Sequence, residues 1–348
     1  MDGLRGISIW TVLLAHASSH FAGTWLHIRR VHEVLATLAY FGVTVFFVIS
    51  GFLITSLLVK EHTRSSSIDL GQFYRRRAVR ILPASLVYIG VVLALGSATK
   101  AQSVYALTFT TSFFFRQAYT PLQQLWSLSV EEQFYLLWPL VLLAGVRSAK
   151  RCGWTVMIFC PVLRLFLGIR GYPEIEHLAP AIADSLAAGC LLAVYYEKVR
   201  AFALRYLVSG SNFVLLCLAS IVTLELAIRW NMVFWGIVPC MIALIISAAI
   251  ERRDKVLNKG PLVWSGLLSY SLYLWQQPFL VLDGPLNFLS VRLAATFAAA
   301  YISYRFVEQP ALGALRREEK RHFALAATIT GEVQPEHRAL RGPVVEAQ

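Results

Sequence analysis

A histidine and an arginine near the start of the chain are the first residues whose types and spacing could do chemistry. His16 follows Arg5 by eleven positions within an apolar stretch. On a helix, eleven residues return almost to the starting face and rise about 16 Å, roughly half of a bilayer's hydrocarbon thickness. We therefore expect Arg5 at one membrane interface and His16 near mid-membrane on the same face. A neutral imidazole there can act as a general base, and the alternative is a structural hydrogen bond between helices.

A metal site is a further alternative, because His16 and His20 are four positions apart and share a helical face. Zinc needs three or four protein ligands, and the sequence shows no convincing third one. The five cysteines lie within or beside apolar segments and have no CxxC spacing. We therefore expect no metal, and neither a disulfide framework nor a zinc site.

Three arginines form a second candidate group, in the stretch Phe73-Tyr-Arg-Arg-Arg-Ala-Val-Arg80. Arg76 and Arg80 are four apart and Arg77 and Arg80 three apart, which puts them on one helical face. Guanidinium groups bind phosphate bidentately, so the cluster suits a phosphate-rich donor. It equally suits an anchor at the cytoplasmic membrane edge or contact with lipid head groups. The sequence alone leaves these alternatives open.

Two adjacent carboxylates begin a later apolar run, Trp126-Ser-Leu-Ser-Val-Glu-Glu-Gln-Phe-Tyr135. Ser129 stands three residues before Glu132, a spacing typical of a capping box at a helix start. Adjacent helical residues point about 100° apart, so one of Glu131 and Glu132 can face the bundle while the other caps. An inward carboxylate could orient an imidazole or bind an acceptor hydroxyl. We expect both glutamates at the outer end of their span.

Other polar or small residues interrupt apolar runs and give weaker signals. Ser50 and Gly51 break a bulky run, which indicates close helix packing or, alternatively, a substrate lining. Gln276 and Gln277 lie inside an apolar segment and need partners or a polar cavity. Further ionisable residues within apolar segments are Arg164, Asp184, Glu225 and Arg229.

The elements that must position these residues are membrane helices. Hydrophobic residues make up 57% of the chain and charged residues 15%, in long apolar runs that indicate an all-α, polytopic membrane protein. Residues 102–118 are too polar for a span and look interfacial or re-entrant. No cleavable signal is apparent, so we expect the first helix to be retained. Ten segments are long enough to span: about 6–22, 36–59, 79–97, 127–146, 153–170, 178–196, 206–228, 232–250, 262–282 and 289–308.

The basic residues set the expected orientation. The formal net charge of +12 comes mainly from Lys and Arg in loops after even-numbered spans and in the tail. This pattern predicts cytoplasmic termini, and it explains the charge without a nucleic-acid partner. We expect a membrane domain over residues 1–312 and a polar, disordered cytoplasmic tail over 313–348.

Taken together, these motifs resemble the membrane acyltransferase 3 family, which includes bacterial O-acetyltransferases of surface polysaccharides. The resemblance covers residues 1 to about 312 and has five motifs in the family's order. They are Arg5 with His16, the FFVISGFLI run from Phe46 to Ile54, the arginines, the WSLSVEEQFY block, and SYSLYLW with a closing Glu308-Gln-Pro310. Many members have a histidine where this chain has Gln276, so any role of that histidine does not carry over.

The resemblance implies an enzyme of a bacterial inner membrane that moves an acyl group, with acetyl as the expected one, to a hydroxyl of a carbohydrate or related acceptor. His16 would be the catalytic base or acyl carrier and Arg5 its companion, with Glu131 or Glu132 in the site. Arg76, Arg77 and Arg80 would contact acyl-CoA, a donor substrate rather than a tightly bound cofactor. No fused esterase-like domain is apparent, so acceptor choice would rest on loops such as 98–126 and 170–180.

A proton-coupled secondary transporter is the alternative from another class, since buried His, Arg and Glu side chains can relay protons. Transporters commonly carry paired half-repeats with Gly/Pro-broken spans at corresponding positions, and this sequence shows no internal repeat. The sequence therefore favours the enzyme.

Overall fold

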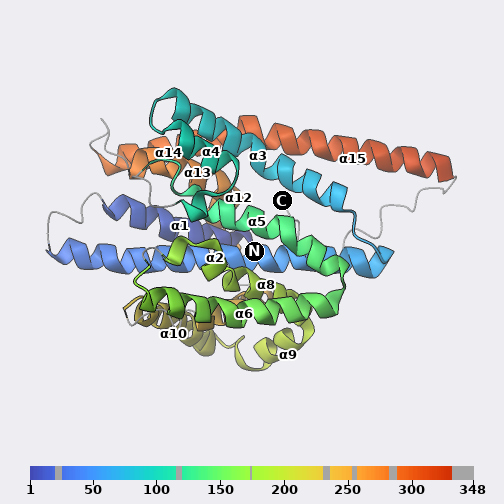
Figure 1. Cartoon of the computed structure of the whole chain (residues 1–348), viewed down its shortest axis with the longest axis horizontal. Helices are drawn as coiled ribbons and strands as arrows, with labels where there is room; N and C mark the ends of the chain where they lie inside the picture. The colour runs from blue at the N-terminus through green and yellow to red at the C-terminus, as the bar shows by residue number, and fades with distance from the viewer. Residues whose placement is uncertain are drawn as a thin grey trace.

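The apolar segments form helices, because a backbone in lipid can satisfy its polar groups only within the segment or within a closed barrel. The computed structural model describes residues 1–19, 26–114, 120–172, 175–229, 236–252, 257–281 and 288–330. Within these ranges the chain is helical and contains no strand. The all-α prediction is confirmed. Figure 1 shows the long helices α2, α3, α6 and α15 extending along the long axis of the molecule.

The helices of the first half have these bounds: α1 Asp2–Ser19, α2 Leu26–Ser65, α3 Leu70–Ala94, α4 Lys100–Leu107, η1 Thr111–Phe113, α5 Leu125–Leu143 and α6 Val146–Ile169. Those of the second half are η2 Ile175–His177, α7 Ala179–Ile182, α8 Asp184–Val194, α9 Tyr196–Tyr206, α10 Gly210–Arg229, α11 Ile237–Arg252, α12 Gly260–Leu267, α13 Ser269–Leu280, α14 Leu289–Ser303, the π-helix η4 Tyr304–Glu308 and α15 Gln309–Thr330.

Four helices of the described residues are long and apolar enough to cross a membrane, which supports multi-pass character: Val31–Ser65, Leu70–Ala94, Val146–Ile169 and Gly210–Ile228. The other predicted spans fall on helices that are shorter or less apolar, two of them in two pieces, α7 with α8 and α12 with α13. The total of ten spans and the cytoplasmic termini stay predictions. Residues 102–118 hold only the short α4 and η1, in agreement with the expectation that they do not span; 115–119 lie outside the described residues.

Glycines bring α1 against α12 on both sides of Arg5. A methyl group at Gly3 would overlap with Leu257 O, just before α12. One at Gly6 would lie 2.1 Å from Leu262 O. Only a residue without a side chain permits so short a backbone separation. This packing fixes where the first turns of α1, and therefore Arg5, lie in the bundle.

Glycines also allow the backbones of α2 and α8 to approach closely. A Cβ atom at Gly51 would lie 2.1 Å from Leu186 O, and one at Gly189 would lie 2.1 Å from Val48 O. The packing interpretation of Gly51 is therefore confirmed. Ser50, its neighbour, faces elsewhere and lines the cavity described below.

The sequence predicts a disordered tail from residue 313. In the structure α15 continues as helix to Thr330. Its sequence from Ala311 to Arg321 is rich in Ala, Leu, Arg, Glu and Lys, which are strong helix formers. Leu315 is buried, and two ion pairs join the helix to α3. A polar composition is thus compatible with a packed helix here. Residues 331–348 lie outside the described residues.

Candidate active site

A cavity of about 130 Å³ lies inside the bundle, and α1, α2, α3, α5 and α13 all contribute to its walls. Four of the residues singled out from the sequence meet there: Arg5, Arg77, Arg80 and Glu131. His16, Glu132 and Arg76 are not among the lining residues. The remaining polar lining comes from Ser50, Ser127, Tyr135, Ser269, Tyr270 and Tyr273.

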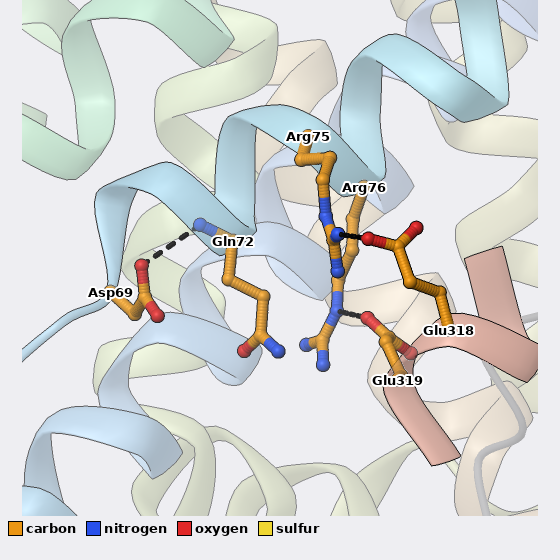
Figure 2. A network of polar contacts seen from close by, with 6 residues as sticks. All are labelled: Asp69, Gln72, Arg75, Arg76, Glu318 and Glu319. Carbon is orange, nitrogen blue, oxygen red and sulfur yellow. Dashed lines mark hydrogen bonds and ion pairs between the residues drawn. The ribbon is translucent and has the colours of Figure 1, made fainter. Parts of the chain in front are cut away.

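Helix α3 carries Arg77 and Arg80 deeper into the molecule than the sequence predicts. It begins at Leu70, with Asp69 Oδ1 accepting a hydrogen bond from Gln72 N at 2.8 Å (Figure 2). The span was expected to start at residue 79. Arg80 is consequently about 15 Å along the helix rather than at its first turn.

Arg77 points toward α5. Its guanidinium lies over the ring of Tyr135, 5.4 Å from the centroid, and 5.9 Å from that of Phe73. Both distances are within the range of a cation–π interaction. The contact holds Arg77 at the cavity wall.

Arg76 takes a different direction from its two neighbours. Its Nε atom donates to Glu319 on α15 at 2.7 Å, and the adjacent Arg75 pairs with Glu318 at 2.5 Å (Figure 2). At 100° per residue, Arg80 lies between Arg76 and Arg77 around the helix, so Arg76 is at the edge of the face. Of the three arginines expected together, the structure brings two to the cavity.

The two glutamates also separate. Glu131 lines the cavity with Arg77 and Arg80, so the arginines and this carboxylate share one site rather than opposite ends of the membrane domain. Glu132 Oε1 is buried and makes no hydrogen bond within the described part of the chain. The capping-box interpretation is wrong, because α5 begins at Leu125 and Ser129 donates instead to Leu125 O at 2.9 Å.

A serine and a tyrosine complete the wall between α2 and α5. Ser50 Oγ and Tyr135 OH are 2.5 Å apart. Ser50 therefore lines the cavity. Of the two interpretations of the Ser50-Gly51 pair, close packing applies to Gly51 and a cavity lining to Ser50. Tyr135 was overlooked in the sequence, although it follows Glu131 by four positions and shares its helical face.

His16 lies farther along α1 and contacts α13. Its Nδ1 atom is 3.1 Å from Oε1 of Gln276, a fully buried glutamine. Gln276 Nε2 is in turn 3.4 Å from Oε1 of Gln124. Inside its apolar segment, the Gln276 amide therefore has two partners: its oxygen contacts His16 and its nitrogen contacts Gln124.

The same network reaches the cavity wall. Tyr273 OH donates to the backbone oxygen of Gln124 at 2.8 Å, and Ser127 Oγ donates to Tyr273 OH at 2.7 Å. Tyr273 and Ser127 both line the cavity. His16 is therefore connected to the cavity through Gln276 and Tyr273 of α13, with Gln124, just before α5, between them. Ser127 and Tyr273 lie within sequence motifs, whereas no local pattern marks Gln124.

Glu308, which closes the last motif, is also directed inward. The π-helix η4 ends at this residue, and π-turns are frequent at functional sites. Ser271 donates a hydrogen bond to Glu308, which is buried, and the charges of Glu308 and Arg80 interact. The last sequence motif marks Glu308, and the structure buries it beside Ser271 of α13.

The remaining ionisable candidates are structural. Arg164 Nη2 and Asp184 Oδ2 are 2.5 Å apart, and Arg164 Nη1 donates to Ala181 O at 2.5 Å. They line a separate cavity of about 30 Å³, which is the space of one water molecule. Glu225 accepts from Thr37. His20 and the side chain of Arg229 lie outside the described residues.

The loop 170–180, expected to help choose the acceptor, contributes a buried imidazole. His177 Nε2 is 3.1 Å from Tyr40 OH, and its ring meets Trp126 edge to face at 4.8 Å. Burial lowers the pKa of His177 to about 3, so the ring is neutral at physiological pH. It contributes packing and hydrogen bonding here, not charge.

Fold and cavity together define a helical, multi-pass membrane protein with an internal cavity of guanidinium and carboxylate groups, to which a hydrogen-bond network connects the imidazole of His16. The chain belongs to the family described as acyltransferase domain, whose model matches residues 1–304. This confirms the resemblance, and it leaves the transporter alternative without support.

Named relatives are bacterial. The O-acetyltransferase OatA of Staphylococcus aureus strain NCTC 8325 is 30% identical over 380 residues, covering 95% of this chain and 59% of the relative. The peptidoglycan O-acetyltransferase OatA of Listeria monocytogenes is 27% identical over 358 residues, covering 89% of this chain and 55% of the relative. The chain thus spans less than two thirds of the length of these relatives. No solved structure matches the chain significantly.

Proposed function

We propose that the chain is an integral membrane O-acetyltransferase that moves an acetyl group from acetyl-CoA to a hydroxyl of a cell-wall glycan such as peptidoglycan. Membership of the acyltransferase family supports the transfer, and the relatives named as peptidoglycan O-acetyltransferases support the acceptor class. The site lies in the inner membrane of a bacterium, with both termini and the donor in the cytoplasm and the glycan on the other side.

The observation that carries the donor assignment is the convergence of three guanidinium groups, those of Arg5, Arg77 and Arg80, on one cavity. Glu131 is the one carboxylate among the lining residues. Nε of Arg5 is buried and makes no hydrogen bond within the described residues. A buried donor without an acceptor is unfavourable, and a phosphate oxygen would satisfy it. The cavity therefore suits an anion.

The cavity admits only part of acyl-CoA. Its volume of about 130 Å³ is below the 300 Å³ or so of the smallest drug-sized sites. We assign the phosphates to the arginines, with the adenosine outside and the pantetheine extending toward His16. Arg76, which is paired with Glu319, contributes less to donor binding than Arg77 and Arg80 do.

His16 acts as the general base in this proposal. Its imidazole takes the proton from the acceptor hydroxyl while the hydroxyl oxygen attacks the thioester carbonyl carbon. The carbon–sulfur bond breaks, and the protonated imidazole returns the proton to the departing thiolate of CoA. The arginines hold the donor in reach of this step, and Glu131 balances part of their charge inside the cavity.

Turnover of acetyl-CoA by the purified protein tests the function. The protein would be reconstituted in lipid nanodiscs with radiolabelled acetyl-CoA and a lipid-linked muropeptide, and acetyl ester on the glycan and free CoA would be measured. We expect release of CoA with formation of an acetyl ester. Folded protein that binds acetyl-CoA but releases no CoA, with or without the glycan, would contradict the proposal.

A further inference from the structure

We propose that Gln276 and Gln124 set the tautomer of His16, so that its proton is held on Nδ1 and the basic lone pair is on Nε2. Both glutamines are positioning residues in this scheme, because they act through His16. The proposal rests on the role of His16 as base. It adds which ring nitrogen accepts the proton and which residues determine the tautomer.

At the end of the network farthest from His16, the hydrogen-bond partners are backbone carbonyls. Gln124 Nε2 is 2.6 Å from Leu274 O. A carbonyl oxygen only accepts hydrogen bonds, so the group facing it must be the NH₂ end of the Gln124 amide. The second hydrogen of that NH₂ is directed to Tyr88 OH at 3.1 Å.

Tyr88 confirms the direction of that bond. Its hydroxyl has a single hydrogen, which it donates to Pro121 O at 2.6 Å. The hydroxyl oxygen is therefore an acceptor toward Gln124, and the amide of Gln124 cannot be reversed without placing its carbonyl against two acceptors. Two backbone carbonyls thus fix how Gln124 lies.

The orientation then passes from Gln124 to the histidine. With its NH₂ occupied, Gln124 presents Oε1 to Gln276, so the Nε2 end of Gln276 must face it, at 3.4 Å. Gln276 consequently presents Oε1 to His16 Nδ1 at 3.1 Å. An amide oxygen can only accept, so Nδ1 of His16 carries the hydrogen.

Burial fixes the direction of each hydrogen bond in this network. Gln276 and Tyr88 are fully buried and Gln124 is 4% exposed, so water does not compete for their hydrogen-bonding groups. Reversing one amide, or moving the proton of His16 to Nε2, would leave a buried polar atom facing a like group. One such loss shifts the tautomer equilibrium by about ten- to a hundredfold. The network therefore holds the imidazole as a base whose lone pair is at Nε2.

A neighbouring glutamine offers a matched control. Gln277 follows Gln276 on α13 and is buried as well, but its Oε1 makes no hydrogen bond within the described residues. Replacing Gln277 by Leu removes a buried amide of the same size from the same helix without touching the His16 network.

Nitrogen NMR of the full chain in nanodiscs, labelled with ¹⁵N-histidine, measures the tautomer directly. The signal of His16 is identified by subtracting the spectrum of His16→Ala, and the ¹⁵N shifts distinguish a protonated Nδ1 from a protonated Nε2. We expect the Nδ1–H form in wild type and in Gln277→Leu. In Gln276→Leu we expect a mixture. In Gln276→Glu we expect a return to the Nδ1–H form, because a protonated carboxyl group can accept from Nδ1 with one oxygen and donate to Gln124 Oε1 with the other.

Kinetics on the same samples adds a second readout. Gln276→Leu should lower kcat for acetyl-CoA turnover by about tenfold or more, within the range that a general base contributes. It should leave KM for acetyl-CoA within about twofold of wild type, because no donor contact is removed. Gln276→Glu should recover most of the lost kcat.

The outcomes separate this inference from the proposed function. A wild-type His16 protonated on Nε2 would overturn the inference without any variant, even if Gln276→Leu fails to fold. An unchanged tautomer and kcat in well-folded Gln276→Leu would overturn it too. An Nδ1–H tautomer lost in Gln276→Leu, in a protein that does not turn over acetyl-CoA, would support the inference while contradicting the proposed function.

Discussion

Three arginines within five consecutive positions have two different environments. Arg77 and Arg80 face the cavity, whereas Arg76 forms an exposed ion pair with Glu319. An exposed pair contributes at most about 1 kcal/mol, because water already solvates both charges. The same charge on the wall of the internal cavity is available to a ligand phosphate. Residue type and spacing alone therefore do not define a donor site.

Replacing Arg80 by Ala should weaken binding of acetyl-CoA by about 1.5–3 kcal/mol, the worth of one charge-assisted hydrogen bond. Arg80→Lys should recover only part of this loss, because an ammonium keeps the charge but lacks the bidentate fork. Calorimetric titration of acetyl-CoA into the reconstituted variants measures both effects.

Arg75→Ala is the matched control for the Arg80 variants. Arg75 lies on the same helix and is paired with Glu318 away from the cavity, so its loss should change the affinity by less than about twofold. Equal affinities in wild type, Arg80→Ala and Arg80→Lys would show that the cluster anchors the helix and that the donor binds elsewhere.

Among the helices, glycines determine which pairs can pack with their backbones in contact. Gly51 and Gly189 let the α2 and α8 backbones touch, and Ser50 on the adjacent face of α2 then reaches the cavity. Without a hydrophobic driving force between helices in lipid, such close van der Waals packing is a main source of association. The part of the cavity wall that Ser50 forms thus depends on contacts on the neighbouring face of α2.

Gly51→Ala should lower the unfolding temperature of the detergent-solubilised protein by several degrees, because the new methyl would lie 2.1 Å from Leu186 O and the two helices must separate. Gly90→Ala provides the comparison, since a Cβ atom at Gly90 of α3 meets no atom within 4 Å. That variant should be neutral or slightly more stable, as Ala favours helix over Gly. An equal unfolding temperature for the two variants would disprove the packing argument.

Much of this arrangement could be predicted from the sequence, and the remainder depends on tertiary contacts. Apolar runs indicated the helices, and the i,i+3 spacing placed Arg77 and Arg80 on one face. The pairing of Arg76 with Glu319, 243 positions away, has no local signal. Nor has the contact of Gln124, in the segment before α5, with Gln276 on α13. Both depend on which helices become neighbours, and local periodicity does not contain that information.

For the whole molecule, transfer across the bilayer requires that donor and acceptor reach one site from opposite sides. The basic loops predict that residues 60–78 are cytoplasmic and residues 98–125 are not. Arg77, Arg80 and Glu131 nevertheless line one cavity inside the bundle. A site within the bundle is accessible in principle to both sides.

Cysteine labelling tests this orientation in a background from which the five native cysteines are removed. Ser67→Cys, before α3, and Lys100→Cys, at the start of α4, are suitable because both residues are exposed. In right-side-out vesicles an impermeant reagent should label position 100 and not position 67. Equal labelling at both positions would overturn the predicted topology.

In the proposed mechanism His16 performs the chemistry, and replacing it tests that role. His16→Ala should insert and fold like wild type while kcat for acetyl-CoA turnover falls by at least about two orders of magnitude, a typical contribution of a general base. His62→Ala, in the last turn of α2, should keep its activity. A well-folded His16→Ala protein that turns over acetyl-CoA at the wild-type rate would contradict the account.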